Sequence, residues 1–266
     1  MISVGINGAA GRMGQRLVAL ASEDASLKLA AALERAGHEQ LGQDAGLVAG
    51  AGELGVALAE HWRERPDVVI DFTRPEALAG LLAKVRAEAV AVVVGTTGLG
   101  PAEHLLLDEA AGEVAVLQAP NTSLGVNLLF ALAGQVARQL GEAYDIEIVE
   151  AHHRFKADAP SGTALGLAEA ICRATGKSVE RDVVHGRSGQ QPRKPGEIGM
   201  HAMRLGDEVG RHVVSFGAPG EQIELGHRAT TRDVFVRGAL RAAQWIAEKP
   251  PGRYTMADVL GLDSAE

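Results

Sequence analysis

Residues 150–164, EAHHRFKADAPSGTA, bring together several side chains that can transfer protons or bind anions. Because histidine titrates near neutral pH, His152 is a candidate acid for the proton that accompanies hydride transfer to an unsaturated carbon. Lys156 offers a cation to a carboxylate, and the run Ser161-Gly162-Thr163 after Pro160 predicts a helix start whose N–H groups offer a second anion site. The segment therefore predicts protonation of a small substrate that carries carboxylates.

A metal site is the alternative for this segment, because His152, His153 and Asp158 are all potential ligands. Consecutive residues of an extended segment point to opposite faces, so the two histidines could not easily share one ion. Taken singly, each residue also has an ordinary structural explanation: a hydrogen-bonded histidine, a solvated lysine, and a helix cap at Ser161. Their coincidence on one loop favours a catalytic site that holds no metal.

A glycine-rich loop, Gly8-Ala9-Ala10-Gly11-Arg12-Met13-Gly14, directly follows the first apolar segment. Its glycines permit a sharp turn and let backbone N–H groups approach a pyrophosphate at a helix N-terminus. The spacing differs from G-x-G-x-x-G and is weak evidence by itself. The prediction of a phosphate-binding loop therefore depends on its position between a predicted strand and a predicted helix. The alternative is a purely structural turn.

Two charged residues follow at the end of the second predicted strand. Glu34 can accept hydrogen bonds from the adenosine ribose, and Arg35 can pair with a 2′-phosphate. A solvated charge pair is the alternative, but the glycine loop favours a cofactor site that accepts both NADH and NADPH.

Small polar residues close two further predicted strands, at Gly95-Thr96-Thr97-Gly98 and at Ala119-Pro120-Asn121-Thr122. In an open parallel sheet the ligand lies outside the carboxyl ends of the strands. These two segments are therefore expected to contact the nicotinamide ribose and amide.

Short apolar runs alternate with helical patterns in the first part of the chain. Strands that alternate with helices in this way indicate βαβ units and a parallel sheet. The glycine-rich segment 37–55 shows no obvious element and is expected to be a surface excursion. The predicted strands are 2–6, 27–33, 68–72, 90–95 and 114–119, and the predicted helices are 13–21, 76–86 and 101–111.

The pattern changes after Pro120. Three strand-like segments separated by glycine-containing turns are expected to be antiparallel. The predicted helices here are 123–141, 161–174 and 232–246, the predicted strands are 145–151, 198–205, 212–216 and 222–227, and a short element is expected near 254–260.

The predicted fold class is therefore α/β, a Rossmann-type doubly wound parallel sheet with an inserted α+β domain that has a mixed, largely antiparallel sheet. The predicted dinucleotide-binding domain comprises residues 1–122 and 233–266, and the predicted substrate-binding domain comprises 123–232. An insertion is favoured because the last long helix can return to cover the first sheet.

Composition narrows the function. The 266 residues are 46% hydrophobic and 23% charged, as in a globular protein. The net charge of −8, without a basic patch, argues against nucleic acid as a partner.

The single cysteine, Cys172, lies in a helical apolar pattern and is interpreted as a buried thiol. Neither a signal-peptide pattern nor an apolar run of about 20 residues is present, so a cytoplasmic protein without membrane contact is expected.

Taken together, segment 150–164, the glycine loop, Asp71-Phe72-Thr73-Arg74-Pro75 and Gly95–Gly98 resemble the dihydrodipicolinate reductase family over nearly the whole chain. The family belongs to the diaminopimelate route to lysine. The resemblance implies NAD(P)H-dependent reduction of 4-hydroxy-tetrahydrodipicolinate to tetrahydrodipicolinate, with hydride from the nicotinamide and the proton from His152. It also implies a homotetramer formed through the sheet of the substrate domain.

The resemblance assigns residues to roles. His152 and Lys156 would be catalytic, and the substrate carboxylates would be held by His153, Ser161, Gly162 and Thr163. Relatives often have an aromatic residue at the position of Thr122. The residues implied to bind the dinucleotide are Gly8, Ala9, Ala10, Gly11, Arg12, Met13, Glu34, Arg35, Phe72, Arg74, Gly95, Thr96, Thr97, Ala119, Pro120, Asn121 and Thr122.

Two rival functions remain. The first is a reductase of the same architecture that acts on a different imine or ketone. The second is a dinucleotide-binding regulator without turnover, which could keep the glycine loop but would have no reason to carry the side chains of residues 152–163.

Overall fold

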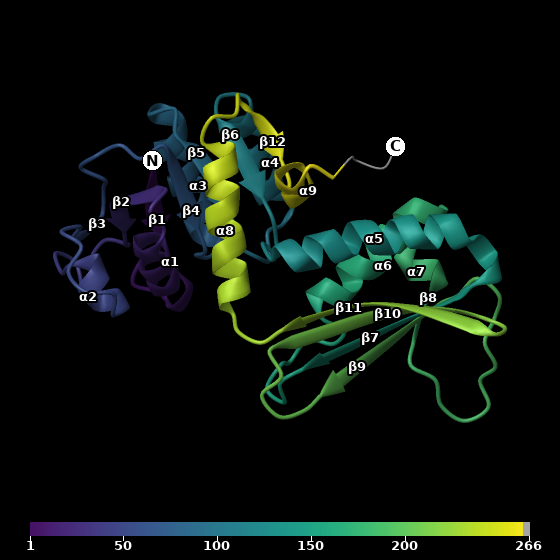
Figure 1. The fold of residues 1–266 in the computed structure, drawn as a ribbon. Helices are drawn as coiled ribbons and strands as arrows, with labels where there is room; N and C mark the ends of the chain where they lie inside the picture. The colour runs from purple at the N-terminus through teal and green to yellow at the C-terminus, as the bar shows by residue number, and fades with distance from the viewer. Residues whose placement is uncertain (263–266) are drawn as a thin grey trace. The chain divides into compact units, whose positions relative to one another are not determined.

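The computed structural model describes residues 1–262 of the chain (Figure 1). These residues divide into two compact units. Unit 1 comprises Met1–Ser123 and Asp233–Gly261, and unit 2 comprises Leu124–Arg232. Each unit has its own sheet and its own buried core.

The described residues of unit 1 form a seven-stranded, entirely parallel sheet in the order β12-β6-β5-β4-β1-β2-β3. The order reverses direction between β1 and β4, as in a doubly wound sheet. This confirms the predicted Rossmann-type sheet. The strands are β1 (Ile2–Asn7), β2 (Leu27–Leu33), β3 (Leu58–Ala59), β4 (Val68–Asp71), β5 (Ala91–Val94), β6 (Ala115–Gln118) and β12 (Gly252–Tyr254).

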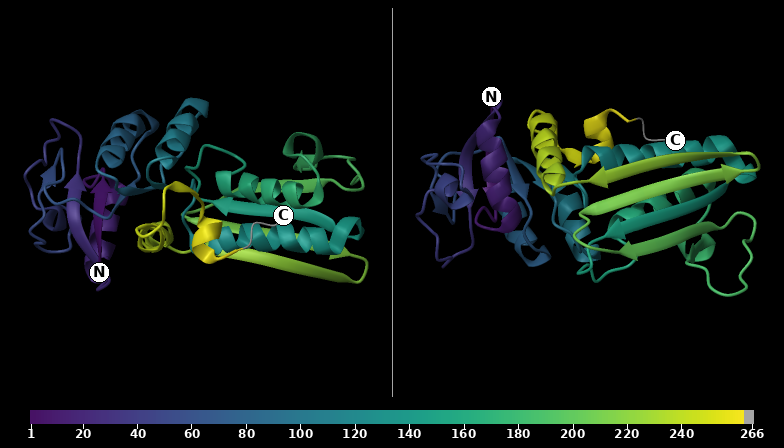
Figure 2. Two further views of the ribbon diagram at one scale, coloured as in Figure 1. Left: turned by 90° about the horizontal axis from the view of Figure 1, so that it is seen from above. Right: turned by 60° about the horizontal axis from the view of Figure 1, so that its bottom comes forward.

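Helices cover both faces of this sheet, which explains why β4 and β5 are continuous apolar runs rather than alternating ones. Leucines of α3 and α4 pack with the strand valines in one buried cluster. Helix α8 packs against β4, β5 and β6, and Figure 2 shows it on the other side of the sheet. The helices of unit 1 are α1 (Arg12–Glu23), α2 (Ala45–Ala49), α3 (Pro75–Ala87), α4 (Pro101–Ala111), α8 (Asp233–Ile246) and α9 (Met256–Leu260).

The expectation that segment 37–55 lacks secondary structure is wrong, because it contains the short helix α2. Asp44 caps this helix: its carboxylate accepts hydrogen bonds from the N–H groups of Gly46 and Leu47. The same carboxylate also accepts from the N–H groups of Leu54 and Val56, which closes the loop. A helix of five residues is too short for a hydrophobic period, so the cap was its only local signal.

Unit 2 places α5 and α6 on one face of a five-stranded sheet of order β11-β10-β7-β9-β8 (Figure 2). Cys172 is buried in the core between helices and sheet, as predicted. Within residues 1–262, no helix is long and apolar enough to cross a membrane. The elements are α5 (Leu124–Leu140), η1 (Gly141–Ala143), β7 (Asp145–His152), α6 (Gly162–Thr175), α7 (Val179–Asp182), β8 (Val183–His185), β9 (Ile198–Arg204), β10 (Gly210–Ala218) and β11 (Glu221–Ala229).

The mixed sheet of unit 2 confirms the predicted class. Strand β10 is antiparallel to β7 and β11, whereas β9 is parallel to β7 and β8. Successive strands β9, β10 and β11 therefore run in alternating directions, as expected, but β9 does not pair with β10, because β7 lies between them. The connection from β7 to β9 contains α6 and crosses over the sheet, which returns the chain in the parallel direction.

Candidate active site

The glycine loop of unit 1 joins the end of β1 to the start of α1, which is the context that a phosphate-binding turn requires. Gly8 has φ +73°, and a Cβ on it would lie 2.7 Å from Thr73 Cγ2. A Cβ on Gly14 would lie 2.1 Å from the carbonyl oxygen of Gly8. Only glycines at these two positions let α1 lie against the loop and leave the backbone open to a phosphate group. The loop therefore fits a dinucleotide.

Asp71 is a buried carboxylate that sequence reasoning left without a role. It accepts hydrogen bonds of 2.7 Å from Asn7 Nδ2, Thr73 Oγ1 and Thr96 Oγ1. Asn7 is the last residue of β1, and the two threonines follow β4 and β5. The Asp71 carboxylate thus connects the ends of three strands at the carboxyl edge of the sheet. The signal in the sequence was an acidic residue that closes the otherwise apolar strand VVID.

The end of β2 lies beside the glycine loop. The Glu34 carboxylate accepts from the N–H of Ala10 at 3.3 Å and from the N–H of Arg35 at 3.0 Å. The residue Arg35 itself is exposed. Glu34 thus contacts the glycine loop, and Arg35 follows it with an exposed side chain.

The other predicted cofactor residues lie at the ends of β4, β5 and β6. The Phe72 ring lies against Gly95, where a Cβ would be 2.4 Å from Phe72 Cζ. Arg74, at the start of α3, and Thr97 are exposed, whereas Thr96 is buried. Thr122 is also buried, and its hydroxyl donates to the carbonyl of Phe235 in α8 at 2.6 Å. The Thr122 side chain therefore anchors α8.

A second cluster lies at the end of β7 in unit 2. His152 Nδ1 is 2.6 Å from Oε2 of the fully buried Glu150. An ionised carboxylate can only accept, so Nδ1 carries the proton and Nε2 is the nitrogen left for a substrate. A Cβ on Gly210 would lie 3.2 Å from this Nε2, so the glycine keeps space beside it.

Arg204 donates to Glu150 through both terminal guanidinium nitrogens, Nη1 and Nη2, at 2.9 Å each. Burial alone would raise the pKa of Glu150, but hydrogen bonds from Arg204, from His152 and from the Ser161 N–H lower it below its usual value. The carboxylate is therefore ionised at neutral pH, and its buried charge is fully paired.

The start of α6 forms the third part of this cluster. Ser161 is the N-cap: its hydroxyl accepts from the N–H of Ala164 and lies 3.1 Å from His212 Nε2. Gly162 follows in the first turn, where a Cβ would meet nothing within 4 Å. The predicted helix start at Ser161 is confirmed, and the space beside the first turn is open.

Lys156 and His153 complete the loop between β7 and α6. Lys156 Nζ is 2.8 Å from Asp158 Oδ2, and the ion pair lowers the pKa of that carboxyl. His153 Nδ1 is buried and finds no hydrogen-bond partner among residues 1–262. The same part of the chain brings no three His, Cys, Asp or Glu side chains close enough to hold a metal ion.

His212 on β10 is buried beside His152, with the two rings 5.2 Å apart. Burial and then the nearby His152 lower the pKa of His212 from 6.5 to about 4. The unfolded chain therefore takes up a proton near pH 6.5, whereas the folded chain does so only near pH 4. As the pH falls from 6.5 to 4, this difference in pKa lowers the free energy of unfolding by about 3 kcal/mol.

We expect His212→Gln to lose less stability than the parent protein over this pH range, because glutamine does not titrate. Urea unfolding followed by circular dichroism at intervals between pH 7 and pH 4 measures the difference. Equal pH slopes for the two proteins would show that His212 does not titrate in this way.

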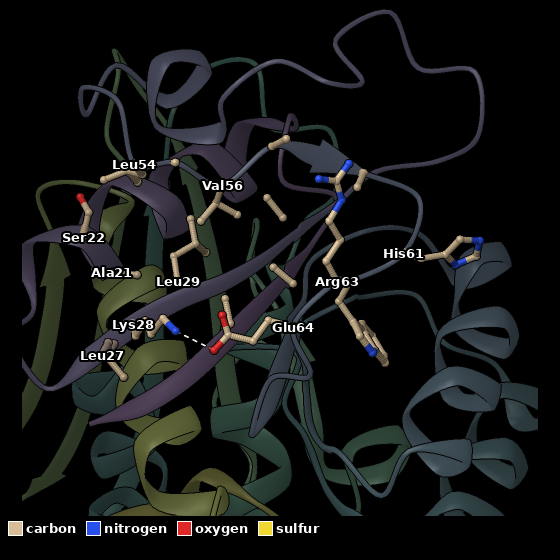
Figure 3. Close-up of a pocket in the computed structure, with 17 residues that line it drawn as sticks. Ala21, Ser22, Leu27, Lys28, Leu29, Leu54, Val56, His61, Arg63 and Glu64 are labelled. Carbon is tan, nitrogen blue, oxygen red and sulfur yellow. Dashed lines mark hydrogen bonds and ion pairs between the residues drawn. The ribbon is translucent and has the colours of Figure 1, made fainter.

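A cavity of about 510 Å³ lies elsewhere in unit 1, along β2 and segment 54–64 (Figure 3). Lys28 and Glu64 form an ion pair of 2.6 Å at its edge. The cavity shares no lining residue with the glycine loop, with Glu34 and Arg35, or with the cluster around His152. This cavity thus does not mark the residues that carry the chemistry.

The parallel sheet with its glycine cradle, together with an acid–base cluster beside a cation and a helix start, defines a nicotinamide-dependent oxidoreductase. The model of the family "Dihydrodipicolinate reductase, N-terminus" matches residues 2–122, and that of "Dihydrodipicolinate reductase, C-terminus" matches residues 125–260. The chain belongs to the dihydrodipicolinate reductase family, as its motifs predicted.

Relatives of known name agree with this assignment. The 4-hydroxy-tetrahydrodipicolinate reductase of Alkalilimnicola ehrlichii is 48% identical, and the alignment covers 97% of this chain and 98% of the relative. That of Geobacter sulfurreducens is 47% identical over 98% of this chain and all of the relative. The solved structure of a dipicolinate-bound dihydrodipicolinate reductase from Paenisporosarcina sp. TG-14 has the same fold, with a TM-score of 0.75 at 24% identity over 97% of this chain and 98% of that one.

Proposed function

We propose that the chain reduces 4-hydroxy-tetrahydrodipicolinate to tetrahydrodipicolinate with NAD(P)H, as a step of the diaminopimelate route to lysine. The observation that carries the proposal is the geometry at His152: Glu150 holds its Nδ1, which leaves Nε2, next to Gly210, as the nitrogen that can give a proton to a substrate. The names of the relatives, at 47–48% identity over nearly the full chain, support the substrate.

The reaction adds one hydride and one proton to the substrate, and the 4-hydroxyl group leaves as water. When bound, the nicotinamide supplies the hydride. His152 donates the proton from Nε2 and regains it from solvent. Lys156 binds one carboxylate, and the N–H groups of Gly162 and Thr163 at the N-terminus of α6 bind the other. The unpartnered Nδ1 of His153 supports its role as a further carboxylate ligand.

Unit 1 holds the dinucleotide in this proposal. The backbone of the glycine loop cradles the pyrophosphate, and the segments after β4, β5 and β6 contact the nicotinamide half. Glu34 accepts from the adenosine ribose, and the exposed Arg35 pairs with a 2′-phosphate when one is present. This pair of residues supports the use of both NADH and NADPH.

The sheet of unit 2 is the proposed interface of a homotetramer. Among the described residues of unit 2, no other helix or strand covers the face opposite α5 and α6 (Figure 2), and Met203 on this face is half exposed. Val149 on β7 and its antiparallel partner Val213 on β10 lie on the same face. Sedimentation velocity at micromolar concentration tests the interface, and a monomeric mass would contradict it.

Absorbance at 340 nm tests the function. With freshly generated 4-hydroxy-tetrahydrodipicolinate, we expect oxidation of both NADH and NADPH that depends on the substrate. A panel of other imines and ketones serves as the control. Turnover of a panel member alone would indicate a different reductase, and cofactor binding without any turnover would indicate a regulator.

A further inference from the structure

We propose that the buried Glu150–Arg204 pair is the positioning element of the active site, through which one carboxylate orients His152, the loop that carries Lys156, and the start of α6. The inference rests on the proposed function and deepens it. The proposed reaction uses Glu150 only to hold His152 Nδ1, and it gives Arg204 no role.

Glu150 is an unusual residue for a core, since an acid with no exposed surface is stable only when its charge is paired. Both of its oxygens are occupied. Oε2 accepts from His152 Nδ1 at 2.6 Å and from Arg204 at 2.9 Å, while Oε1 accepts from Arg204 at 2.9 Å and from the Ser161 N–H at 3.1 Å. Each contact reaches a different part of the active-site cluster.

The contact with His152 determines which ring nitrogen carries the proton. A carboxylate at Nδ1 holds the imidazole in the tautomer that presents Nε2 to the substrate, and it stabilises the ring once both nitrogens are protonated. An amide in its place can donate to Nδ1 and select the wrong tautomer. The acid form of His152 that the reaction uses therefore depends on a charge at Glu150.

Arg204 extends the same arrangement to the loop. Besides binding Glu150, its guanidinium donates to the carbonyl of Asp158 at 2.6 Å. Asp158 in turn pairs with Lys156. The Ser161 N–H bond anchors the residue that caps α6. The buried charge of Glu150 thus holds His152 and the start of α6 directly, and it holds the loop of Lys156 through Arg204.

Other ionisable groups face this cluster from the neighbouring elements. His212 on β10 is packed against His152, and His227 lies opposite His212 on β11. Burial lowers the pKa of both, so they are neutral when the site is active. Two cations, Arg204 and Lys156, lie near the Glu150–His152 pair, which we call the dyad. Glu150 is the carboxylate in contact with His152.

The first test is Glu150→Gln in the full-length protein. We expect kcat to fall by about 10²-fold or more, because a wrong tautomer alone costs about 10⁴-fold in a comparable dyad. The dependence of kcat on pH should also change, because the acid form of His152 loses the carboxylate that it contacts. The KM for the dinucleotide should stay within threefold, because that site lies in unit 1.

The matched control is Glu147→Gln on the same strand. Glu147 also contacts a histidine, His201, at 2.7 Å and is also paired with arginines, but it lies on the other face of the sheet. We expect the control to keep the kcat and the pH profile of the parent protein, with its oligomeric mass checked by sedimentation. An equal loss in both variants would assign the effect to general destabilisation and overturn the proposal.

A second variant guards against misfolding. Glu150→Gln leaves the partly buried guanidinium of Arg204 without a carboxylate, so the double variant Glu150→Gln/Arg204→Met should regain thermal stability. Its kcat should remain low. Recovery of kcat together with stability would overturn the positioning role.

A readout without turnover separates this inference from the proposed function. In ¹⁵N-histidine NMR spectra of the parent protein, the neutral His152 ring should carry its proton on Nδ1, and Glu150→Gln should abolish this preference. An unchanged tautomer would overturn the inference even if the enzyme is active. A lost preference would support the dyad even if the proposed substrate proved wrong.

Discussion

His152→Gln is expected to lower kcat by about 10²-fold or more, because a positioned acid contributes about 10²–10⁴-fold and glutamine cannot release a proton. The substitution keeps most of the volume of the ring, whose side chain is only 11% exposed. Binding of the dinucleotide should be unaffected. Steady-state oxidation of NADPH at 340 nm, with cofactor and substrate both saturating, measures kcat directly.

His201→Gln is the control for this substitution. His201 is also paired with a glutamate, Glu147, but it lies on the opposite face of the same sheet. We expect its kcat to stay within threefold of that of the parent protein. If His152→Gln also stayed within threefold, another group would have to deliver the proton.

Lys156→Ala is expected to lower kcat/KM for the substrate by about 10- to 100-fold, the loss of a charge-assisted hydrogen bond of about 1.5–3 kcal/mol. Most of the loss should appear in KM, because the cation holds a carboxylate both before and during the reaction. The ion pair with the exposed Asp158 contributes little stability, so the Tm should hardly change. Initial rates over a range of substrate concentrations separate kcat from KM.

Asp158→Asn provides the matched control for Lys156. It removes the partner and keeps the cation, so kcat/KM should fall far less than in Lys156→Ala. A substrate KM that is unchanged in Lys156→Ala would place the carboxylate on other residues, with His153 and the start of α6 as the remaining candidates.

Several features of this protein follow from local sequence alone. The valine-rich runs of β4 and β5 are buried on both faces of a parallel sheet, and the helices between the strands have the length of βαβ crossovers. The glycine turn at Gly8 lies between a strand and a helix, as its pattern predicts. Ser161 caps a helix because it follows Pro160 and precedes an apolar helical run.

The partners of Glu150 were not predictable in this way, although one signal was present. In a strand, residues two apart point to the same face, so Glu150 and His152 could have been paired from their spacing. Arg204 offered no comparable signal. It lies 54 residues from Glu150 and reaches it because β7 and β9 are parallel with His152 opposite Arg204.

Hydrophobic period and capping are properties of neighbouring residues, so the sequence by itself determined the alternation of elements, the glycine turn and the loop that carries His152 and Lys156. Strand direction and register depend on pairing between distant segments, which the period does not encode. The tertiary structure therefore decided that β9 runs parallel to β7, and that His212 lies opposite Glu150 on β10. These pairings place the carboxylate of Glu150, the guanidinium of Arg204 and the neutral ring of His212 around His152.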